Sequence, residues 1–352
     1  MYPPSYEEFS QRDWDDETVE GTLSFALVGL GGFTREWVVP AIDGSEYAET
    51  TCVVSGDSEK AQEVAETADA DVSLTYEEFE NGVDSDAYDA VYIATPNATH
   101  LDLTEAAAEH EKHVLCEKPM EISADRSRQM VDRCEEEGVS LMIAYRIHFE
   151  PAMRWVRDLL SSGEIGDPVH VRGSMSQPIF EMIGPDPDQW RLNPELSGGA
   201  ALIDLGIYPL NTTRFLLDAD PVAADGRSRS PTDGFESVDE HVAFTVEFEN
   251  GVLGSYTASQ NAAISSHLHV TTTDGEIRIE PAFFGDVDVS ITDGERRTTV
   301  TFEEANAIRA EFDYFASRVL NDRPLEPDGE HGLVDMEAIE SIYESDDVLE
   351  PI

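Results

Sequence analysis

The first half of the chain alternates short, continuously apolar runs with segments of helical periodicity. A strand that is apolar along its whole length is buried on both faces, which is typical of a parallel sheet covered by helices. The pattern therefore predicts an α/β domain with a parallel sheet over residues 22–147. Its expected strands are 23–28, 51–55, 90–94, 113–116 and 140–144. Ligands of such sheets bind beyond the carboxyl ends of the strands, so the loops there are the first candidates for a site.

The second half of the chain has a different pattern. Between residues 242 and 302, short runs alternate apolar and polar side chains, and Asn250-Gly251 and Asp274-Gly275 are typical of hairpin turns. We therefore expect an α+β domain over 148–352, with a large, mainly antiparallel sheet and helices on one of its faces. Residues 1–21 are expected to form an N-terminal arm.

Acidic side chains dominate the composition, because 74 Asp and Glu stand against 22 Lys and Arg and give a formal net charge of −52. Such a surface repels phosphate backbones and anionic lipids, which argues against nucleic acids and membranes as partners. The acids are spread along the whole chain, so the folded protein would repel itself unless molar salt shortens the screening length to about 3 Å. We therefore expect a halophilic protein, and an acidic protein of a mesophile is the alternative.

Three further features favour a soluble cytoplasmic protein. No run of 18 apolar residues occurs, and the opening residues carry no basic or apolar signal region. The chain has 3 cysteines, an odd number that does not suggest a disulfide framework.

A glycine-rich loop follows the first predicted strand and precedes a helix. Gly29 suits a tight turn, and Gly31 lets the backbone approach a pyrophosphate at the amino terminus of the helix. Thr34 replaces the third glycine of the usual dinucleotide fingerprint. Glycines in such a place can also form a turn alone, but the surrounding sheet favours a dinucleotide site. The residues expected to form it are Gly29, Gly31, Gly32, Phe33 and Thr34.

The end of the second strand bears on the choice between NAD and NADP. An NAD site usually places Asp or Glu there to bind the ribose 2′-hydroxyl, whereas this strand ends in Ser55 and Gly56. Lys60, in the first turn of the next helix, can reach a 2′-phosphate, and Arg35 can assist it. These residues favour NADP.

Two observations favour NAD instead, or no role at all. Asp57 and Glu59 are acids close to the expected ribose, and Lys60 can be an ordinary solvated helix residue. Lysine is rare in this chain, however, and is found only at Lys60, Lys112 and Lys118. We therefore expect NADP as the cofactor.

Two more motifs follow predicted strands at the same edge of the sheet. Thr95-Pro96-Asn97 can contact the nicotinamide ribose, and His100 is a further candidate contact to the cofactor or the substrate. Glu117 and Lys118 begin a Glu-Lys-Pro motif that would lie beside the nicotinamide. An ammonium there can hydrogen-bond a substrate hydroxyl and favour the anionic form of a neighbouring acid.

A glycine-rich segment in the second half leads into a helix that carries Asp204 and Tyr208. Residues four apart share one face of a helix. A tyrosine hydroxyl beside Lys118 can act as a general base, and Asp204 can orient the substrate or the lysine. The alternative is an acid at the start of a helix and a packed tyrosine without a catalytic role.

The order of these motifs resembles the Gfo/Idh/MocA oxidoreductases over residues 22–348. The resemblance also includes Tyr145-Arg146, Trp190-Arg191 and the segment 338–345. The turn at 55–60 is similar to the NADP-binding turn of glucose–fructose oxidoreductase. Tyr208 stands where many inositol dehydrogenase relatives have histidine, which points to the same branch. The family has a Rossmann domain followed by an α+β domain.

The resemblance implies a reaction and the residues that perform it. Lys118 would hold the substrate and the nicotinamide, Tyr208 would exchange the proton of the sugar hydroxyl, and Asp204 would support both. The expected reaction is NADP-dependent oxidation of an aldopyranose at C1, with D-xylose and its lactone D-xylonolactone as the leading pair. Hydride would pass from C1 to NADP.

The resemblance also assigns residues around this centre. Trp190 and Arg191 would reach the cofactor, and Tyr145 and Arg146 would line the substrate site. No step needs a metal, and the histidines lack ligand spacing.

Other functions remain open. A glucose–fructose oxidoreductase-like enzyme would retain its NADP, and residues 1–21 would then cover the cofactor of a neighbouring subunit. A redox sensor that binds NADP without catalysis, or a structural protein with a vestigial fold, should have lost a catalytic residue. We also expect a homodimer or homotetramer packed through the open sheet face.

Overall fold

The computed structural model of the protein describes residues 18–182 and 189–345. Its backbone divides into two compact units. The first holds the described residues up to Phe149 together with Asn306–Leu333, and the second holds Glu150–Ala305 together with the described residues from Val334 onward. The predicted N-terminal arm, residues 1–21, lies outside the described residues except for 18–21.

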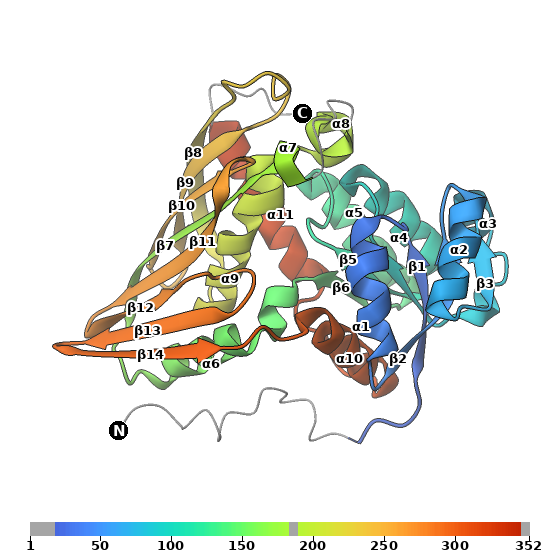
Figure 1. Ribbon diagram of the computed structural model, residues 1–352, viewed down its shortest axis with the longest axis horizontal. Helices are drawn as coiled ribbons and strands as arrows, with labels where there is room; N and C mark the ends of the chain where they lie inside the picture. Colours follow the sequence, from blue (N-terminus) through green and yellow to red (C-terminus); the bar gives the residue numbers. More distant parts are fainter. Residues whose placement is uncertain (1–17, 183–188, 346–352) are drawn as a thin grey trace. The chain divides into compact units, whose positions relative to one another are not determined.

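The first unit is built on a six-stranded parallel sheet of order β3-β2-β1-β4-β5-β6, as the apolar runs predicted (Figure 1). Its strands are β1 (Leu23–Val28), β2 (Ala48–Val54), β3 (Val72–Leu74), β4 (Ala90–Ile93), β5 (His113–Glu117) and β6 (Leu141–Ala144). Only β3 was not expected, because three residues are too few to show a pattern. The chain order reverses between β1 and β4, where a sheet of this kind binds its ligands.

Helices form a layer on each face of this sheet. One layer holds α1 (Val39–Asp43), α2 (Ser58–Ala68) and α10 (Ala307–Leu320), and the other holds α3 (Tyr76–Glu80), α4 (His100–Glu109) and α5 (Ala124–Glu137). Shorter turns are η2 (Thr34–Val38), η3 (Ser85–Ala87), η4 (Asn97–Thr99) and η5 (Arg146–Phe149).

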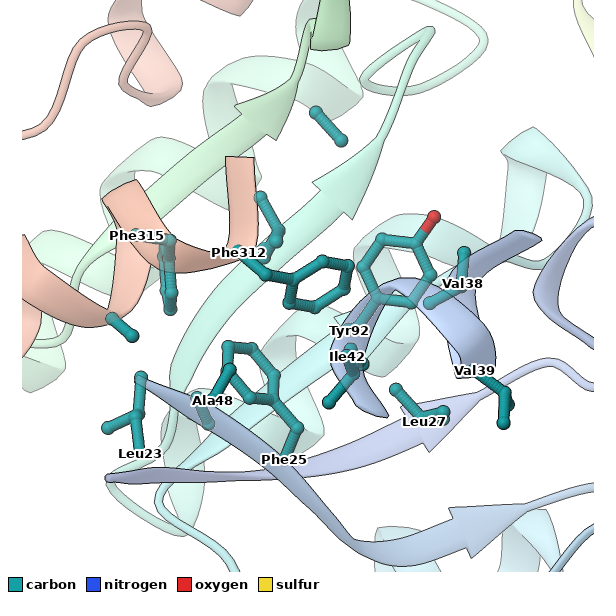
Figure 2. Close-up of a cluster of buried hydrophobic side chains, with 14 of the residues drawn as sticks. Leu23, Phe25, Leu27, Val38, Val39, Ile42, Ala48, Tyr92, Phe312 and Phe315 are labelled. Carbon is teal, nitrogen blue, oxygen red and sulfur yellow. The ribbon is translucent and has the colours of Figure 1, made fainter. Parts of the chain in front are cut away.

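The core of the first unit explains why α10 belongs to it. The Phe312 ring lies 5.1 Å from both Phe25 of β1 and Tyr92 of β4, and Phe315 lies 5.8 Å from Phe25 (Figure 2). These aromatic contacts bury α10 against the parallel sheet. The division predicted at residue 147 placed the segment 306–333 in the second domain, whereas the structure packs it with the first.

The second unit is built on an eight-stranded sheet of order β14-β13-β12-β11-β7-β10-β9-β8, which is antiparallel except for the parallel pair β7 and β10. This confirms the predicted fold class. The strands are β7 (Pro168–Pro178), β8 (Pro221–Arg229), β9 (His241–Phe248), β10 (Leu253–Ser259), β11 (Asn261–Thr272), β12 (Gly275–Ile279), β13 (Val287–Asp293) and β14 (Arg296–Phe302). Along β9, buried and exposed residues alternate, so one face of the sheet is covered.

The second unit also holds several helices, of which α9 packs against β7 and α6 packs against α9 (Figure 1). They are α6 (Pro151–Ser162), α7 (Ile179–Met182), η6 (Trp190–Leu192), α8 (Pro194–Ser197), η7 (Ala201–Gly206) and α9 (Ile207–Leu217). The boundary between the units falls within α11 (Gly329–Ser345). None of the helices in the described ranges is both long and apolar enough to cross a membrane.

Candidate active site

The predicted site residues fall into two groups, one in each unit. In the first unit, Gly29 directly follows β1 with a φ of +96°, a conformation that favours glycine. A Cβ on Gly29 would lie 2.4 Å from the carbonyl oxygen of Ala94 and 2.7 Å from Thr95 Cγ2. Glycine at this position therefore lets the loop after β1 pack against the loop after β4.

The other two glycines of this loop are open to solvent. No atom lies within 4 Å of a Cβ built on Gly31, and Gly32 has only the Glu36 carboxylate oxygen at 3.8 Å. Phe33 and Arg35 are also exposed. The backbone thus leaves room for a phosphate group in front of the helix, as a dinucleotide site requires.

Thr34 shows how this loop does without a third glycine. Its side chain is buried, and its hydroxyl donates a hydrogen bond of 2.7 Å to the carbonyl oxygen of Gly29. The turn Thr34–Val38 is a π-helix, in which each backbone hydrogen bond spans five residues where that of an α-helix spans four. The threonine is therefore part of the packing between loop and helix.

The end of β2 carries small, neutral residues, as the sequence predicted. Ser55 is buried and its hydroxyl accepts a hydrogen bond from the Asp57 amide at 3.2 Å, while Gly56 is exposed. Asp57 caps α2, because its carboxylate accepts hydrogen bonds from the amides of Glu59 at 3.0 Å and Lys60 at 3.1 Å. Asp57 thus has a structural role that does not depend on a ribose.

Two cations of this region have no partner within the residues that the structure describes. The ammonium of Lys60 and the guanidinium of Arg35 form no hydrogen bond or ion pair there. In a chain with a net charge of −52, free cations next to the strand ends fit a ligand that carries an additional phosphate. The residues present therefore fit NADP.

The loop after β4 is held in place by His100. This ring is buried, with Nδ1 at 3.1 Å from the Met120 carbonyl and Nε2 at 3.0 Å from the Thr95 carbonyl. Burial lowers the pKa of His100. Both nitrogens face the protein backbone, so the structure gives His100 a role in joining two loops and no free nitrogen for a ligand. Asn97 is also buried, while Thr95 and Pro96 are partly exposed.

Glu117, the last residue of β5, is fixed by two hydrogen bonds. The Tyr92 hydroxyl donates to Glu117 Oε1 at 2.6 Å, and the Lys118 amide donates to Glu117 Oε2 at 3.1 Å. Burial raises the pKa of Glu117, and the Tyr92 hydrogen bond and the charges of Lys118 and Arg146 oppose that rise. Lys118 follows at the carboxyl edge of the sheet, as the sequence predicted.

Tyr145 belongs to a cluster of aromatic rings in the first unit. Its ring is buried and stacks on His148 at 5.7 Å, and the edge of His331 approaches it at 5.8 Å. Arg146, the next residue, lies close enough to Glu117 for its charge to lower the pKa of that carboxyl. The structure thus brings Glu117, Lys118 and Arg146 into one electrostatic group.

A second carboxyl in this group, Glu311 of α10, was not predicted from the sequence. It is 1 % exposed, and its Oε1 has no hydrogen-bond partner among the residues described. Burial, followed by the charge of Glu117, raises the pKa of Glu311 well above its usual value. A signal existed, because Glu311 lies four residues from both Ala307 and Phe315 and so shares their buried helix face.

In the second unit, the Asp204 carboxylate of η7 lies close to two polar side chains. The Gln260 side-chain amide donates a hydrogen bond of 2.7 Å to Asp204 Oδ2, and Arg191 Nε lies 3.9 Å from the same oxygen. The Arg191 guanidinium stacks over the Trp190 ring at 4.4 Å. Three of the predicted residues therefore lie together here, and Gln260 is a member that the sequence analysis missed.

Tyr208 is the second residue of α9, the helix that follows η7 directly, and its ring lies 5.5 Å from that of Phe283. The start of η7 is fixed by Asp239, which is fully buried. Its carboxylate accepts hydrogen bonds from the amides of Ala200 at 2.7 Å and Leu202 at 2.6 Å. Asp239 thus holds the helical segment that carries both Asp204 and Tyr208, and sequence reasoning had not singled it out.

No metal centre is apparent in the part of the chain that the structure describes, where no group of three or more His, Cys, Asp or Glu could hold an ion. His267 and His269 lie on the same face of β11 with their rings 4.9 Å apart.

Comparisons with known proteins identify the family of the chain. Residues 23–145 match the model of an oxidoreductase family with an NAD-binding Rossmann fold, and residues 153–278 match that of the GFO/IDH/MocA C-terminal domain. A D-xylose 1-dehydrogenase [NADP(+)] of Haloarcula marismortui is 50% identical over 96% of this chain and 95% of its own. The D-xylose 1-dehydrogenase (NADP(+)) 2 of Haloferax volcanii is 33% identical over 92% of this chain and 97% of its own. Among solved structures, the aldose-aldose oxidoreductase of Caulobacter crescentus has a TM-score of 0.87 and 29% identity, covering 92% of this chain and 97% of that one.

Proposed function

The chain belongs to the Gfo/Idh/MocA family of oxidoreductases, as the order of its motifs predicted, and from this premise we propose that it oxidises an aldopyranose at C1 with NADP. D-xylose is the proposed substrate and D-xylonolactone the product. The observation that carries the proposal is the 50% identity over 96% of the chain with a D-xylose 1-dehydrogenase [NADP(+)].

We assign the cofactor to the first unit. Gly31 and Gly32 would face the pyrophosphate, and Ser55, Lys60 and Arg35 would surround the 2′-phosphate. Further proposed contacts are Gly29, Phe33, Thr34, Gly56, Thr95, Pro96, Asn97, Glu117, Lys118, Trp190 and Arg191. When bound, NADP supplies the acceptor for the hydride that leaves C1 of the sugar. The free cations at Lys60 and Arg35 support NADP over NAD.

We assign the proton and substrate chemistry to three residues. Lys118 holds the sugar hydroxyl, and Tyr208 removes the proton of the C1 hydroxyl as the hydride departs. Asp204, whose carboxylate is fixed by Gln260, orients the substrate. The lactone that leaves the site is hydrolysed afterwards. Tyr145 and Arg146 are the proposed lining of the substrate site.

Substitution of Lys118 tests this assignment. Positioned acid–base groups contribute about 10²–10⁴ in rate, so Lys118→Ala and Tyr208→Phe should each lower kcat/KM for D-xylose by at least about 100-fold. The matched control is Lys112→Ala, because Lys112 lies over the Tyr88 ring at 5.5 Å and has no proposed part in the reaction. Near-normal turnover of Lys118→Ala would show that the assignment is wrong.

A second function is supported by the likeness to the aldose-aldose oxidoreductase structure. An enzyme of that kind would keep its NADP and pass hydride from one sugar to another. Release of NADPH distinguishes the two functions, because a dehydrogenase releases NADPH when a single sugar is added. A protein that releases none, but yields NADP when it is denatured, would support the second function.

We further propose a salt-requiring homodimer or homotetramer of the cytoplasm. The net charge of −52 and the relatives in Haloarcula and Haloferax support the salt requirement. The exposed alternate residues of β9 support assembly through the uncovered face of the large sheet. The three cysteines, all free and buried, fit a reducing compartment. Light scattering in molar KCl and in dilute buffer would test assembly and salt dependence together.

A further inference from the structure

Four elements of the first unit bring ionisable side chains together at the Glu-Lys-Pro motif. Tyr92 comes from β4, Glu117 and Lys118 from the end of β5, Arg146 from η5 and Glu311 from α10. The proposed function uses Lys118 directly but gives no role to Tyr92 or Glu311. The role of these two residues follows from how the two carboxyls are held.

Glu117 has a donor on each oxygen. The Tyr92 hydroxyl lies 2.6 Å from Oε1, and the Lys118 amide lies 3.1 Å from Oε2. The positive charges of Lys118 and Arg146 both act on this carboxyl. Glu117 is therefore the member of the group that is equipped to carry a negative charge.

Glu311 is in the opposite situation. It is 1 % exposed, and its Oε1 has no hydrogen-bond partner among the described residues. Its neighbour in sequence, Phe312, lies 5.1 Å from the Tyr92 ring, which places α10 against the same group. A buried carboxyl without a donor is unfavourable when ionised. The negative charge of Glu117 adds to this effect, and the positive charge of Arg146 opposes it only in part.

We propose that Glu117 and Glu311 act as one buried acid, which holds one proton and one negative charge, and that this charge is the counter-ion that positions the Lys118 ammonium. Two carboxyls that influence each other titrate as a pair and not as separate residues. Removal of one member then moves the single charge to the other, whereas removal of both abolishes it. In the wild type Glu117 therefore carries the charge that positions Lys118, while Glu311 holds the proton and takes the charge only when Glu117 is replaced. The inference rests on the proposed function only where turnover is measured.

The scarcity of lysine provides a test that needs no activity. Trace acetylation with acetic anhydride, followed by mass spectrometry, reports the reactivity of Lys60, Lys112 and Lys118 separately as pH is raised. An ammonium with a buried counter-ion is labelled only at higher pH. The variants are Glu311→Gln, Glu117→Gln and the double variant, all in molar KCl, with Lys60 and Lys112 as internal controls for the fold.

The proposal predicts a non-additive result. Glu311→Gln leaves the Lys118 labelling midpoint unchanged, Glu117→Gln shifts it slightly, and the double variant lowers it by about one pH unit. With D-xylose and NADP, Glu311→Gln should keep kcat/KM within about threefold of the wild type, and the double variant should lose about tenfold.

Two results would overturn the proposal. A shift of about one pH unit in Glu311→Gln alone would mean that Glu311 is already charged, and an unshifted double variant would mean that the pair is not the counter-ion. If Glu311→Gln does not fold, Glu311→Met carries the same prediction, because it also removes the ionisable group. A wild type that turns over no sugar would refute the proposed function, while the labelling would still decide this inference.

Discussion

Replacement of Asp239 by asparagine tests how the helical segment that carries Asp204 is held. Asp239 is fully buried. Its Oδ1 accepts hydrogen bonds from the Ala200 amide at 2.7 Å and the Tyr343 hydroxyl at 3.0 Å, and its Oδ2 accepts one from the Leu202 amide at 2.6 Å. Both oxygens are therefore needed to satisfy backbone donors at the start of η7.

The size of the effect follows from those donors. Asparagine keeps one carbonyl oxygen and turns an NH₂ group toward the other backbone amide, so one buried donor loses its acceptor. That loss costs about 1–3 kcal/mol, and Asp239→Ala, which leaves both amides without an acceptor, should cost roughly twice as much. Tyr343→Phe removes the hydroxyl that donates to Asp239 Oδ1 and should cost about 1 kcal/mol.

Urea unfolding in molar KCl measures these free energies, and turnover of the folded variants measures the effect on the proposed site. Asp239→Asn should lower kcat/KM as well as stability, because η7 leads directly from Asp204 to Tyr208. Tyr343→Phe is the matched control, since it leaves both amide hydrogen bonds in place. If the free energy of unfolding of Asp239→Asn were within about 0.5 kcal/mol of the wild-type value, the amides would have other acceptors, and the proposed role of Asp239 would be refuted.

Three further predictions concern the first unit. Glu311→Gln should change the pH dependence of stability, because the pKa of folded Glu311 is raised well above its usual value. An unfolded glutamate has a pKa of about 4.3. Between this value and the higher pKa of folded Glu311, the folded wild type binds one proton more than the unfolded chain. Its free energy of unfolding therefore falls by about 1.4 kcal/mol per pH unit relative to the variant as the pH rises through this window. Urea unfolding at a series of pH values checks this, and parallel curves would contradict it. Thr34→Val removes the buried hydrogen bond to Gly29 and should cost about 1–2 kcal/mol in the same assay, more than Thr34→Ser, which keeps the hydroxyl. Lys60→Ala should raise KM for NADP about tenfold or more and leave KM for NAD unchanged. An equal change for both cofactors would show that Lys60 does not bind the 2′-phosphate.

The sheets differ in how well the sequence revealed them. The strands of the parallel sheet are buried on both faces and appear as apolar runs, so most were predicted close to their observed bounds. Strand β7 was missed although it pairs with both β10 and β11. Only alternate side chains of β7 are buried, with Val171 and Met175 on one face and Arg172 and Ser174 on the other. A short period-two pattern interrupted by glycine is a weak signal.

The placement of α10 shows a second limit. Phe312 and Phe315 pack on Phe25, nearly 300 residues earlier in the chain. The amphipathic pattern of α10 indicates a helix with one buried face, but it does not indicate which sheet that face covers. A single domain boundary at residue 147 therefore could not assign residues 306–333 to the first unit.

The candidate site divides in the same way. Gly29, Lys118 and Asp204 belong to local motifs whose spacing is visible in the sequence. Asp239 and Glu311 are single carboxyls among 74 acidic residues, and their importance comes from burial, which the sequence does not state. In a chain this acidic, composition hides the few acids that lie inside the protein.

Formation of NADPH, followed by its near-ultraviolet absorbance in molar KCl, tests the central claim most directly. D-xylose, D-glucose and L-arabinose would each be offered with NADP and with NAD to the wild type and to Lys118→Ala. We predict rapid turnover with D-xylose and NADP, slower turnover with NAD, and almost none in the variant. A folded wild type that forms no NADPH with any of the sugars would contradict it.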